Sequence, residues 1–361
     1  MVGMRDVAKE AGVSLSTVSL VVNKTGYVSD DMRARVKAAM EELNYVPNEL
    51  ARNLYKNRTN LVGVIVPTIR HPFFATLTAH LQRELAAQGL RTMLCSTADA
   101  ENGEVEYVDM LRRHMMDGII VCSHTTHPND YWTSIHRPIV AFDRVLGGGI
   151  ASIGSDHEQG GRLMAHMLVN TGAHHVVMIG GPRDQFFDLA ARNGDSPDDF
   201  DLHKTTFPTV RYYLALEQEL KAAGVRYEYV EAGNVEDFQG YKNAVNAVLN
   251  SMPVDGVDAV VSSDIGAALC VREAMRRHIS IPRDLQIIAY DGTYLTDLAG
   301  MKMTAVAQNF DKIAQVAVGN IVRAIAKEGD AKADTTSATG RKPYEPDVLI
   351  PVTLKLGDTT R

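Results

Sequence analysis

The chain has 361 residues, of which 45% are hydrophobic and 22% are charged, and this is typical of a globular protein of two or three domains. Its formal net charge of −7 argues, for the chain as a whole, against nucleic-acid binding, which normally needs an excess of basic side chains. No apolar run reaches the roughly 18 residues of a transmembrane helix, and the N-terminal residues MVGMRDVAKEAGVS lack the apolar core of a secretory signal. Three widely spaced cysteines predict a reduced cytoplasmic protein without a disulfide framework or a cysteine zinc site: Cys95, Cys122 and Cys270.

The charge is distributed unevenly along the chain. Residues 1–60 contain nine Lys and Arg against seven Asp and Glu, whereas residues 61–361 contain 28 against 37. The acidity therefore belongs to the larger part of the chain, and the two parts are expected to have different functions.

Residues 4–46 predict a unit of three short helices. The segment MRDVAKEA has helical spacing of its apolar residues and stops at Gly12, and a second helix follows the N-cap Ser14. A third helix, capped by Ser29 or Asp30, ends before Pro47. Helix, tight turn and helix are the pattern of a helix-turn-helix, whose second helix enters the DNA major groove. A plain three-helix unit with capping serines explains the pattern about as well.

Residues 48–58, NELARNLYKNR, have helical propensity but few apolar side chains. An isolated helix of this length is marginal in water, so it needs a partner in order to fold. The alternative interpretation is a flexible linker.

From Leu61 onward, apolar strands alternate with helices, which predicts a doubly wound parallel sheet. About 300 residues of this pattern exceed one such sheet, so we expect two lobes. Ligands of open α/β sheets bind beyond the carboxyl ends of the strands, which indicates residues 67–74, Asp143, Ser263 with Asp264, and Asp291 as candidates. Two segments interrupt the pattern: an insertion at 183–209, and a stretch of small and polar residues at 329–345 that predicts a mobile surface loop.

The segment MRDVAKEAGVSLSTVSLVVNKTGYVSDDMRARVKAAMEELNYVPNELARNL resembles the N-terminal DNA-binding headpiece of the LacI/GalR family. The resemblance continues through LVGVIVPTIRHPFF, SSDIGAALCVREAM, IPRDLQIIAYDGT and MTAVAQNFDKIAQVAVGNIV to a closing strand in LIPVTLKLGDTTR. It covers nearly the whole chain except 183–209 and 330–344. It implies a homodimeric transcriptional regulator of the repressor type, which binds a double-stranded DNA operator and a small-molecule effector, most often a sugar.

The family's DNA contacts map onto two segments of this chain. In the headpiece the resemblance assigns contacts with base edges to Leu15, Ser16 and Leu20. Four neighbours carry hydroxyl or amide groups suited to phosphate oxygens: Ser14, Thr17, Ser19 and Asn23. In the hinge helix, which folds on the operator, the resemblance assigns DNA contacts to Ala51, Arg52, Asn53 and Leu54. Leu54 is the expected wedge between base pairs. Leu20 stands where many members have a basic residue, and it cannot make the bidentate contact of Arg with guanine.

The resemblance also implies the domain plan. It gives a headpiece at 1–46, a hinge helix or linker at 47–59, and a two-lobed core like that of periplasmic binding proteins at 60–361. Three crossovers are expected near residues 155, 308 and 336. These divide the core into an N-lobe of about 60–155 and 309–336 and a C-lobe of about 156–308 and 337–361.

Seven residues at family positions are expected to face an effector in the cleft between the lobes: Phe73, Phe74, Asp143, Arg211, Ser263, Asp291 and Gln308. Carboxylates and a guanidinium bind vicinal hydroxyls through charge-assisted hydrogen bonds, and an aromatic ring stacks on a sugar. The alternative is that Asp143 and Asp291 cap helices and that Arg211 pairs with a nearby acid.

Two departures from the family pattern prevent the ligand from being copied from a relative. Pro182 and Arg211 are 29 residues apart instead of about ten, so about twenty residues are inserted at the edge of the cleft. Four acids of this insertion suggest a lid, a partner surface or, most simply, a solvated loop: Asp195, Asp198, Asp199 and Asp201. The family's large aromatic residue in GNVEDFQGY is replaced by Val235, and Phe238 is the candidate substitute.

Other classes of protein fit the sequence less well. No nucleophile elbow, phosphate-binding loop or dinucleotide-binding loop is present, and His157-Glu158 does not continue as a metalloprotease motif. His124 and His127 form an HxxH pair without a third ligand, so we expect no catalytic residues, metal or cofactor. A sugar-binding transport receptor would share the core but would not need the headpiece. A non-sugar effector, or a protein co-effector that docks on the N-lobe, remains a second possibility.

Overall fold

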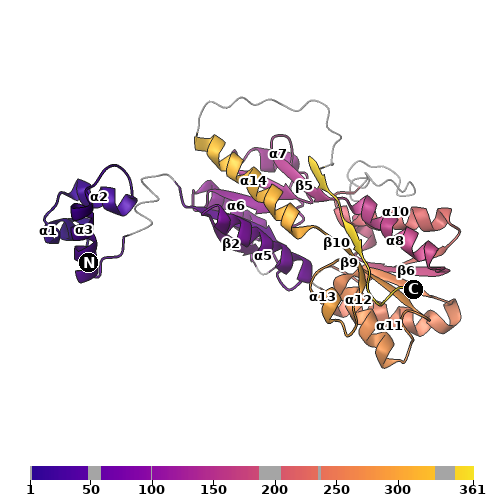
Figure 1. The fold of residues 1–361 in the computed structure, drawn as a ribbon. Coiled ribbons are helices and arrows are strands. Elements are labelled where there is room, and N and C mark those ends of the chain that lie inside the picture. Colours follow the sequence, from indigo (N-terminus) through magenta and orange to yellow (C-terminus); the bar gives the residue numbers. More distant parts are fainter. Residues whose placement is uncertain (1, 48–57, 99, 187–204, 235–236, 330–345) are drawn as a thin grey trace. The chain divides into compact units, whose positions relative to one another are not determined.

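The computed structural model describes residues 2–47, 58–98, 100–186, 205–234, 237–329 and 346–361. The chain divides into two compact units, Met1–Asn60 and Leu61–Arg361 (Figure 1). Residues 48–57 of the predicted hinge, the four acids of the insertion, Val235 and residues 330–345 of the polar stretch lie outside the described residues.

The smaller unit contains three helices: α1 (Met4–Glu10), α2 (Leu15–Asn23) and α3 (Asp30–Glu42). Ser14 caps α2, because its Oγ accepts a hydrogen bond from the Thr17 amide at 3.1 Å, and Ser29 caps α3. The apolar faces of the helices share a small core: Val7, Ala8, Ala11, Val18, Val21, Val28, Val36 and Ala39. The predicted three-helix unit is confirmed.

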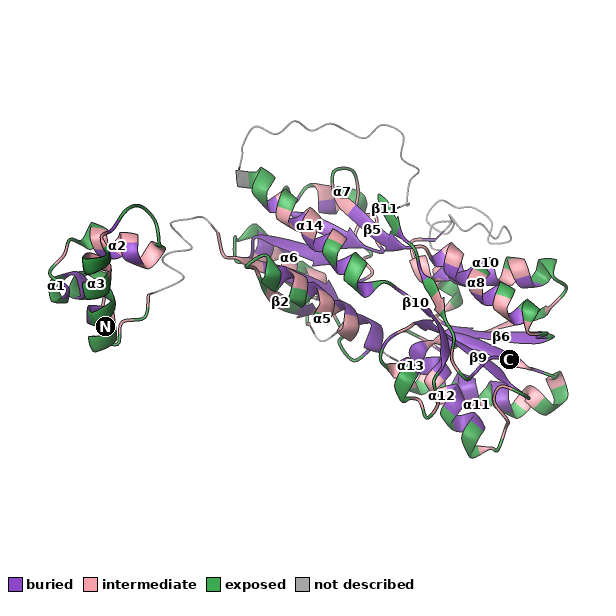
Figure 2. Cartoon of the chain, in the orientation of Figure 1, coloured by how far each residue is buried: buried purple, intermediate pink, exposed green. Residues whose placement is uncertain are grey.

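The larger unit begins with a six-stranded sheet in the order β11-β5-β4-β3-β1-β2, in which all neighbouring strands are parallel. The strands are β1 (Leu61–Val66), β2 (Arg91–Ser96), β3 (Gly118–Val121), β4 (Ile139–Phe142), β5 (Ala151–Ser155) and β11 (Val348–Ile350). One face packs against α5 (Pro72–Ala87) and α14 (Phe310–Gly329), and the other against α6 (Glu104–Arg112) and α7 (Asn129–Thr133). Since both faces are covered, the central strands are continuously apolar and buried (Figure 2).

A second six-stranded sheet has the order β12-β10-β9-β8-β6-β7 and is parallel except for the pair β10 and β12. Its strands are β6 (His175–Gly180), β7 (Arg226–Glu231), β8 (Ala259–Ser263), β9 (Gln286–Asp291), β10 (Thr304–Ala307) and β12 (Thr353–Lys355). One face packs against α8 (His157–Asn170) and α10 (Pro208–Ala222), and the other against α11 (Phe238–Asp255) and α12 (Asp264–Arg276). Two short elements complete the lobe, η1 (Arg183–Phe186) and α13 (Leu295–Leu298). The predicted fold class, two parallel-rich lobes, is confirmed.

The chain passes between the two sheets after β5, after β10 and after β11. The third passage corrects the expected crossover near residue 336 and the assignment of all of 337–361 to the C-lobe. Strand β11 belongs to the first sheet, because Val348 pairs with Ile153 of β5, and β12 belongs to the second, because Thr353 pairs with Ala307 of β10. Pro351, which has no amide proton for a ladder, separates the two strands, so the expected single closing strand is two.

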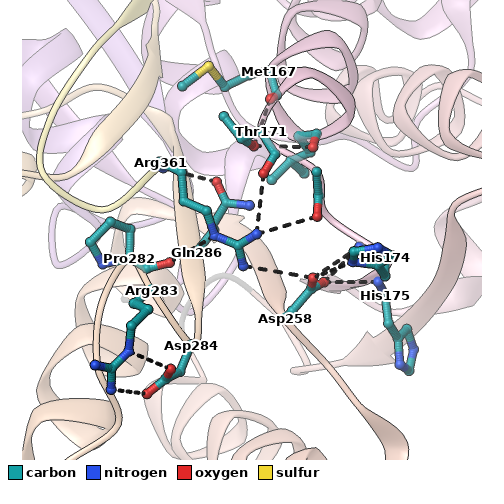
Figure 3. A network of polar contacts seen from close by, with 12 residues as sticks. Met167, Thr171, His174, His175, Asp258, Pro282, Arg283, Asp284, Gln286 and Arg361 are labelled. Atoms are coloured by element: carbon teal, nitrogen blue, oxygen red, sulfur yellow. Dashed lines mark hydrogen bonds and ion pairs between the residues drawn. The ribbon is translucent and has the colours of Figure 1, made fainter.

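The last residue of the chain fastens the C-terminus to the second lobe (Figure 3). The Arg361 guanidinium donates hydrogen bonds to the carbonyl oxygens of Thr171 at 3.3 Å and Pro282 at 3.3 Å, and lies 3.9 Å from Asp258 Oδ2. Its amide donates to Gln286 Oε1 at 3.1 Å. These contacts join loops at the edge of the sheet where the strands begin, so the opposite edge is the one at which polar groups after the strands can meet.

All three cysteines are buried and free. None of the helices in the described part of the chain is long and apolar enough to cross a membrane.

Candidate functional site

The start of α2 presents the exposed part of the predicted DNA-binding surface. The Leu15 side chain is 43% exposed, and Ser14 and Ser16 are exposed beside it. The Ser14 hydroxyl lies 2.7 Å from Ser16 Oγ and 2.8 Å from Thr17 Oγ1, so three hydroxyls gather at this helix end. A helix N-terminus that carries hydroxyls can receive phosphate oxygens.

The later residues of α2 are less accessible. Thr17, Ser19, Leu20 and Asn23 are half-buried, and the Asn23 amide donates to Ser19 Oγ at 3.2 Å. Leu20 packs against the core of the smaller unit. Sequence reasoning missed Tyr27, which is 92% exposed in the loop after α2 and has a hydroxyl suited to a phosphate. The sequence could have indicated Tyr27, because it is a lone aromatic residue in a loop of small and polar residues. The hinge residues Ala51, Arg52, Asn53 and Leu54 lie outside the described residues.

A cavity of about 450 Å³ lies between the two lobes. Six of the seven predicted effector residues line it: Phe73, Phe74, Asp143, Ser263, Asp291 and Gln308. Arg211, the seventh, is 9% exposed and lines a smaller adjoining cavity of about 50 Å³. Arg211 therefore does not line the same cavity as the other six predicted effector residues.

Asp143 and Asp291 lie at the carboxyl ends of β4 and β9, where the parallel-sheet argument expects ligand-binding groups. Both have positive φ angles, 51° and 118°, which are uncommon for residues other than glycine. In the described contacts neither caps a helix, contrary to the alternative considered from the sequence. Asp143 Oδ1 accepts the Ser155 amide at 3.1 Å, and Asp291 Oδ1 accepts Gln308 Nε2 at 2.8 Å.

A network of hydrogen bonds crosses from one lobe to the other beneath the cavity. His157 lies between Asp143 Oδ2, 3.1 Å from its Nε2, and the Tyr290 hydroxyl, 2.7 Å from its Nδ1. In parallel, Ser155 Oγ donates to Gln308 Oε1 at 2.6 Å. Since both connections lie where the chain crosses between the sheets, a ligand that contacts Asp143 or Asp291 also contacts the junction of the lobes.

Burial raises the pKa of Asp291 well above its usual range, and the nearby carboxyl of Asp264 raises it further. Asp264 itself accepts hydrogen bonds from the Thr293 amide at 2.6 Å and from the Gly292 amide at 3.1 Å, which fix the loop after β9. The Asp291 carboxyl is thereby favoured in its neutral form, which both donates and accepts hydrogen bonds, as a sugar hydroxyl requires.

Sequence reasoning missed the tyrosines that form the wall of the second lobe. Tyr212 and Tyr290 stack at 3.7 Å with an interplanar angle of 7°, and Tyr213 and Tyr241 also line the cavity. Burial raises the pKa of Tyr212 and of Tyr290, so their phenol groups stay protonated. Phe238, the expected substitute for the family's aromatic residue, packs on the core of the lobe instead, and Tyr241, three residues later on α11, faces the cavity. Residues three apart lie on neighbouring positions of a helix, so the sequence already offered Tyr241 as an alternative to Phe238.

Sequence reasoning also missed Arg144, which lines both cavities. It follows Asp143 directly at the end of β4, which was a signal for it. Its Nε donates to the Ser123 carbonyl at 3.0 Å and its Nη1 to the Asp143 carbonyl at 2.5 Å, so the guanidinium is held at the strand ends.

Among the described residues, no three His, Cys, Asp or Glu side chains are grouped so that they could hold a metal ion, and the two histidines of the HxxH pair have different neighbours. His124 stacks on Phe207 at 3.9 Å and lies 3.2 Å from Thr206 Oγ1, whereas His127 stacks on Tyr131 at 4.0 Å. His124 thus joins the first lobe to residues that precede α10 of the second.

His71 gives the cavity wall a predicted pH dependence. Its Nδ1 accepts the Phe73 amide at 3.3 Å at the N-cap of α5, and burial lowers the pKa of His71 to about 4. The unfolded chain, with an ordinary pKa near 6.5, binds a proton that the folded chain rejects between pH about 6.5 and 4. The contribution of His71 to the free energy of unfolding is therefore complete above about pH 6.5 and is lost as the pH falls toward 4.

The substitution His71→Asn, which keeps a capping acceptor, is expected to reduce this loss. The upper limit is about 1.4 kcal/mol per pH unit, or about 2–3 kcal/mol between pH 6.5 and 4.5. Urea unfolding midpoints at the two pH values test this, with the exposed His136→Asn as the matched control. An equal loss of stability on acidification in wild type and His71→Asn would show that His71 does not carry the effect.

Comparison with known proteins relates both units to one family. Residues 3–48 match the family described as bacterial regulatory proteins, lacI family. Residues 59–194 match the periplasmic binding proteins and sugar binding domain of the LacI family, and residues 165–360 match the periplasmic binding protein-like domain.

Two curated relatives extend along most of the chain. A sucrose operon repressor of Streptococcus mutans is 31% identical over 356 residues, which cover 99% of this chain and 98% of the relative. A ribose operon repressor of Bacillus subtilis is 33% identical over 293 residues, which cover 81% of this chain and 82% of the relative.

Solved structures share the fold. A lac repressor dimer bound to operator and the anti-inducer ONPF has a TM-score of 0.76 at 21% identity, with 99% of each chain covered. A complex of the transcriptional regulator CelR with cellobiose has a TM-score of 0.63 at 23% identity, with 99% of this chain and 100% of that chain covered.

Proposed function

Because the chain belongs to the lacI family of bacterial regulatory proteins, we propose that it is an operator-binding repressor whose DNA affinity is set by a sugar in the larger cavity. The observation that carries the proposal is the combination of two features in one chain. A capped helix exposes Leu15 and Ser16 at its start, and a separate unit holds a cavity of about 450 Å³ between two lobes.

The lining of the larger cavity supports a carbohydrate effector. Aromatic rings line this cavity, among them Phe73, Phe74 and Tyr241, and such rings suit the apolar faces of a sugar ring. Asp143, Asp291 and Gln308 suit its hydroxyls. The names of the relatives, repressors of sucrose and ribose operons, favour the same class.

On the DNA side, the proposed unit is a homodimer with two headpieces on a double-stranded operator of two half-sites. We assign the headpiece to 1–46, the hinge to 47–59 and the core to 60–361, with the last crossover between Ile350 and Thr353. Ala51 to Leu54 are the proposed hinge contacts. A regulator of this class acts in the cytoplasm, where the chromosome is, and we assign it no enzymatic activity, cofactor or metal.

A binding assay with the full-length protein tests the proposal. An operator is first selected from a random duplex library, and its affinity is then measured by fluorescence anisotropy with and without sucrose, fructose, glucose or ribose, each free and phosphorylated. We expect a selected sequence with two related half-sites and a 5- to 150-fold change in affinity with at least one compound. Failure to select any sequence, or an affinity that no sugar changes, would contradict the proposal. A sugar that acted only when a second protein was added would indicate a protein co-effector instead.

A further inference from the structure

The smaller cavity, of about 50 Å³, differs in charge from the larger one that it adjoins. Building on the proposed function, we propose that it receives an anionic substituent of the effector, a phosphoryl or carboxyl group, while the sugar ring occupies the larger cavity. The effector is then a sugar phosphate or a sugar acid rather than a neutral sugar.

The charge of the smaller cavity favours an anion. Among the described residues that line it, Arg144 and Arg211 are the guanidinium groups and Asp143 is the one carboxylate. The two oxygens of Asp143 already contact the Ser155 amide and the His157 ring. Arg144 is held in place as well, since its Nε and Nη1 donate to two backbone carbonyl oxygens. A guanidinium group binds phosphate and carboxylate oxygens through charge-assisted hydrogen bonds, which are stronger than neutral ones.

Two histidines in this wall are occupied elsewhere. His157 is held by Asp143 and Tyr290, and His127 lies 3.5 Å from Glu104 Oε1. His124 lines both cavities and brings a further ring nitrogen to the boundary. Helix α10 begins at Pro208, which also lines both cavities, and its first turn contains no acidic residue. The helix dipole at this end adds to the positive potential of the two arginines.

The size of the cavity limits what it can hold. A water molecule needs about 10–15 Å³ of cavity volume, so a cavity of about 50 Å³ holds about three to five non-hydrogen atoms. A phosphoryl group adds four such atoms to a sugar hydroxyl and a carboxyl group has three, whereas a second sugar ring has about eleven. The smaller cavity therefore fits a small charged group and excludes a second ring.

The larger cavity has the opposite character, and this fixes the orientation of the ligand. Its described lining contains Asp143 and Asp184 against Arg144, together with the aromatic wall and with Asp291, whose raised pKa favours the neutral carboxyl group. A neutral polyol suits this surface and an anion does not. The two cavities adjoin along four lining residues that they share, so a ring in the larger cavity lies within reach of the smaller one: His124, Asp143, Arg144 and Pro208.

Matched ligand pairs test the proposal on the full-length protein. Dissociation constants are measured by calorimetry for sucrose and sucrose 6-phosphate, fructose and fructose 6-phosphate, and glucose, glucose 6-phosphate and gluconate. We expect at least one charged compound to bind at least 30-fold more tightly than its neutral parent. In Arg211→Gln this ratio is expected to fall at least tenfold, because Arg211 lines the smaller cavity and not the larger one.

The surface variant Arg276→Gln is the matched control and is expected to keep the ratio, since Arg276 is 77% exposed on α12. Arg144→Gln provides a second variant with the same expected fall if Arg211→Gln does not fold. A neutral sugar that binds as tightly as its charged form, or a ratio that both variants leave unchanged, would overturn this inference alone. If no compound of either kind bound or altered operator affinity, the proposed function would fail as well.

Discussion

Leu15→Glu is expected to abolish specific operator binding while leaving effector binding intact. Leu15 is exposed at the start of α2, where the resemblance places a contact with base edges. A carboxylate there faces DNA phosphates and loses the apolar contact, at about 1–3 kcal/mol per half-site. Two half-sites then lose about 2–6 kcal/mol, which is about 30-fold to 10⁴-fold in affinity. Anisotropy with the selected operator measures this loss.

The control for this prediction is Ala38→Glu, which adds the same charge to an exposed position of α3 in the same unit. An acidic residue in the first turn of a helix is favourable, so Leu15→Glu is not expected to unfold the headpiece. Circular dichroism should therefore match in the two variants. If both weakened operator binding equally, the loss would be due to net charge alone, and the assignment of α2 as the recognition helix would be wrong.

Arg211→Ala is expected to remove the response to effector and to leave operator affinity without effector within about twofold. Arg211 is 9% exposed and lines the smaller cavity. A charge-assisted hydrogen bond contributes about 1.5–3 kcal/mol. The loss of a bidentate contact with the effector is therefore expected to raise the effector concentration that gives a half-maximal response by about 100-fold or more. Titration of effector into the preformed operator complex measures the response.

Arg276→Ala, at an exposed position of α12, serves as the matched control and should respond as wild type does. An unchanged dose response in Arg211→Ala would remove Arg211 from the effector site. It would also leave the smaller cavity without the group on which the charged-ligand argument most depends.

The strand-end argument predicts much of the cleft from sequence, because parallel strands present their carboxyl ends at one edge. Asp143, Ser263 and Asp291 were found in this way, and all three line the larger cavity. Tyr212 and Tyr290 were missed because a tyrosine within a helix or a strand has the pattern of a core residue. Their stacking depends on α10 and β9 meeting in space, which no local pattern contains.

Arg211 shows a different limit of sequence reasoning. Its identity as a family position was evident, but the insertion before it leaves its place in the cleft open, and the structure puts it in the adjoining cavity. The crossover at Pro351 was missed for another reason. Strands of three residues, such as β11 and β12, are too short to give a periodic signal, so their assignment to different sheets follows only from pairing.

We expect effector binding to be coupled to operator binding through the junction of the lobes. Hydrogen bonds from His157 and Gln308 cross that junction and end on Asp143 and Asp291 at the cavity. A ligand that contacts these carboxyl groups in one lobe orientation and not in another shifts the equilibrium between the two. The DNA-binding unit then responds only if operator binding differs between the same two orientations.

The central claim is that one chain links the two binding events, and thermodynamic reciprocity tests it most directly. The affinity of the full-length protein for the best ligand of the panel is measured by calorimetry in the absence of DNA and with saturating operator. The account predicts that the two dissociation constants differ by the factor, about 5- to 150-fold, by which that ligand changes operator affinity. Dissociation constants that are equal within error, from a protein that binds both the operator and the ligand, would contradict the account.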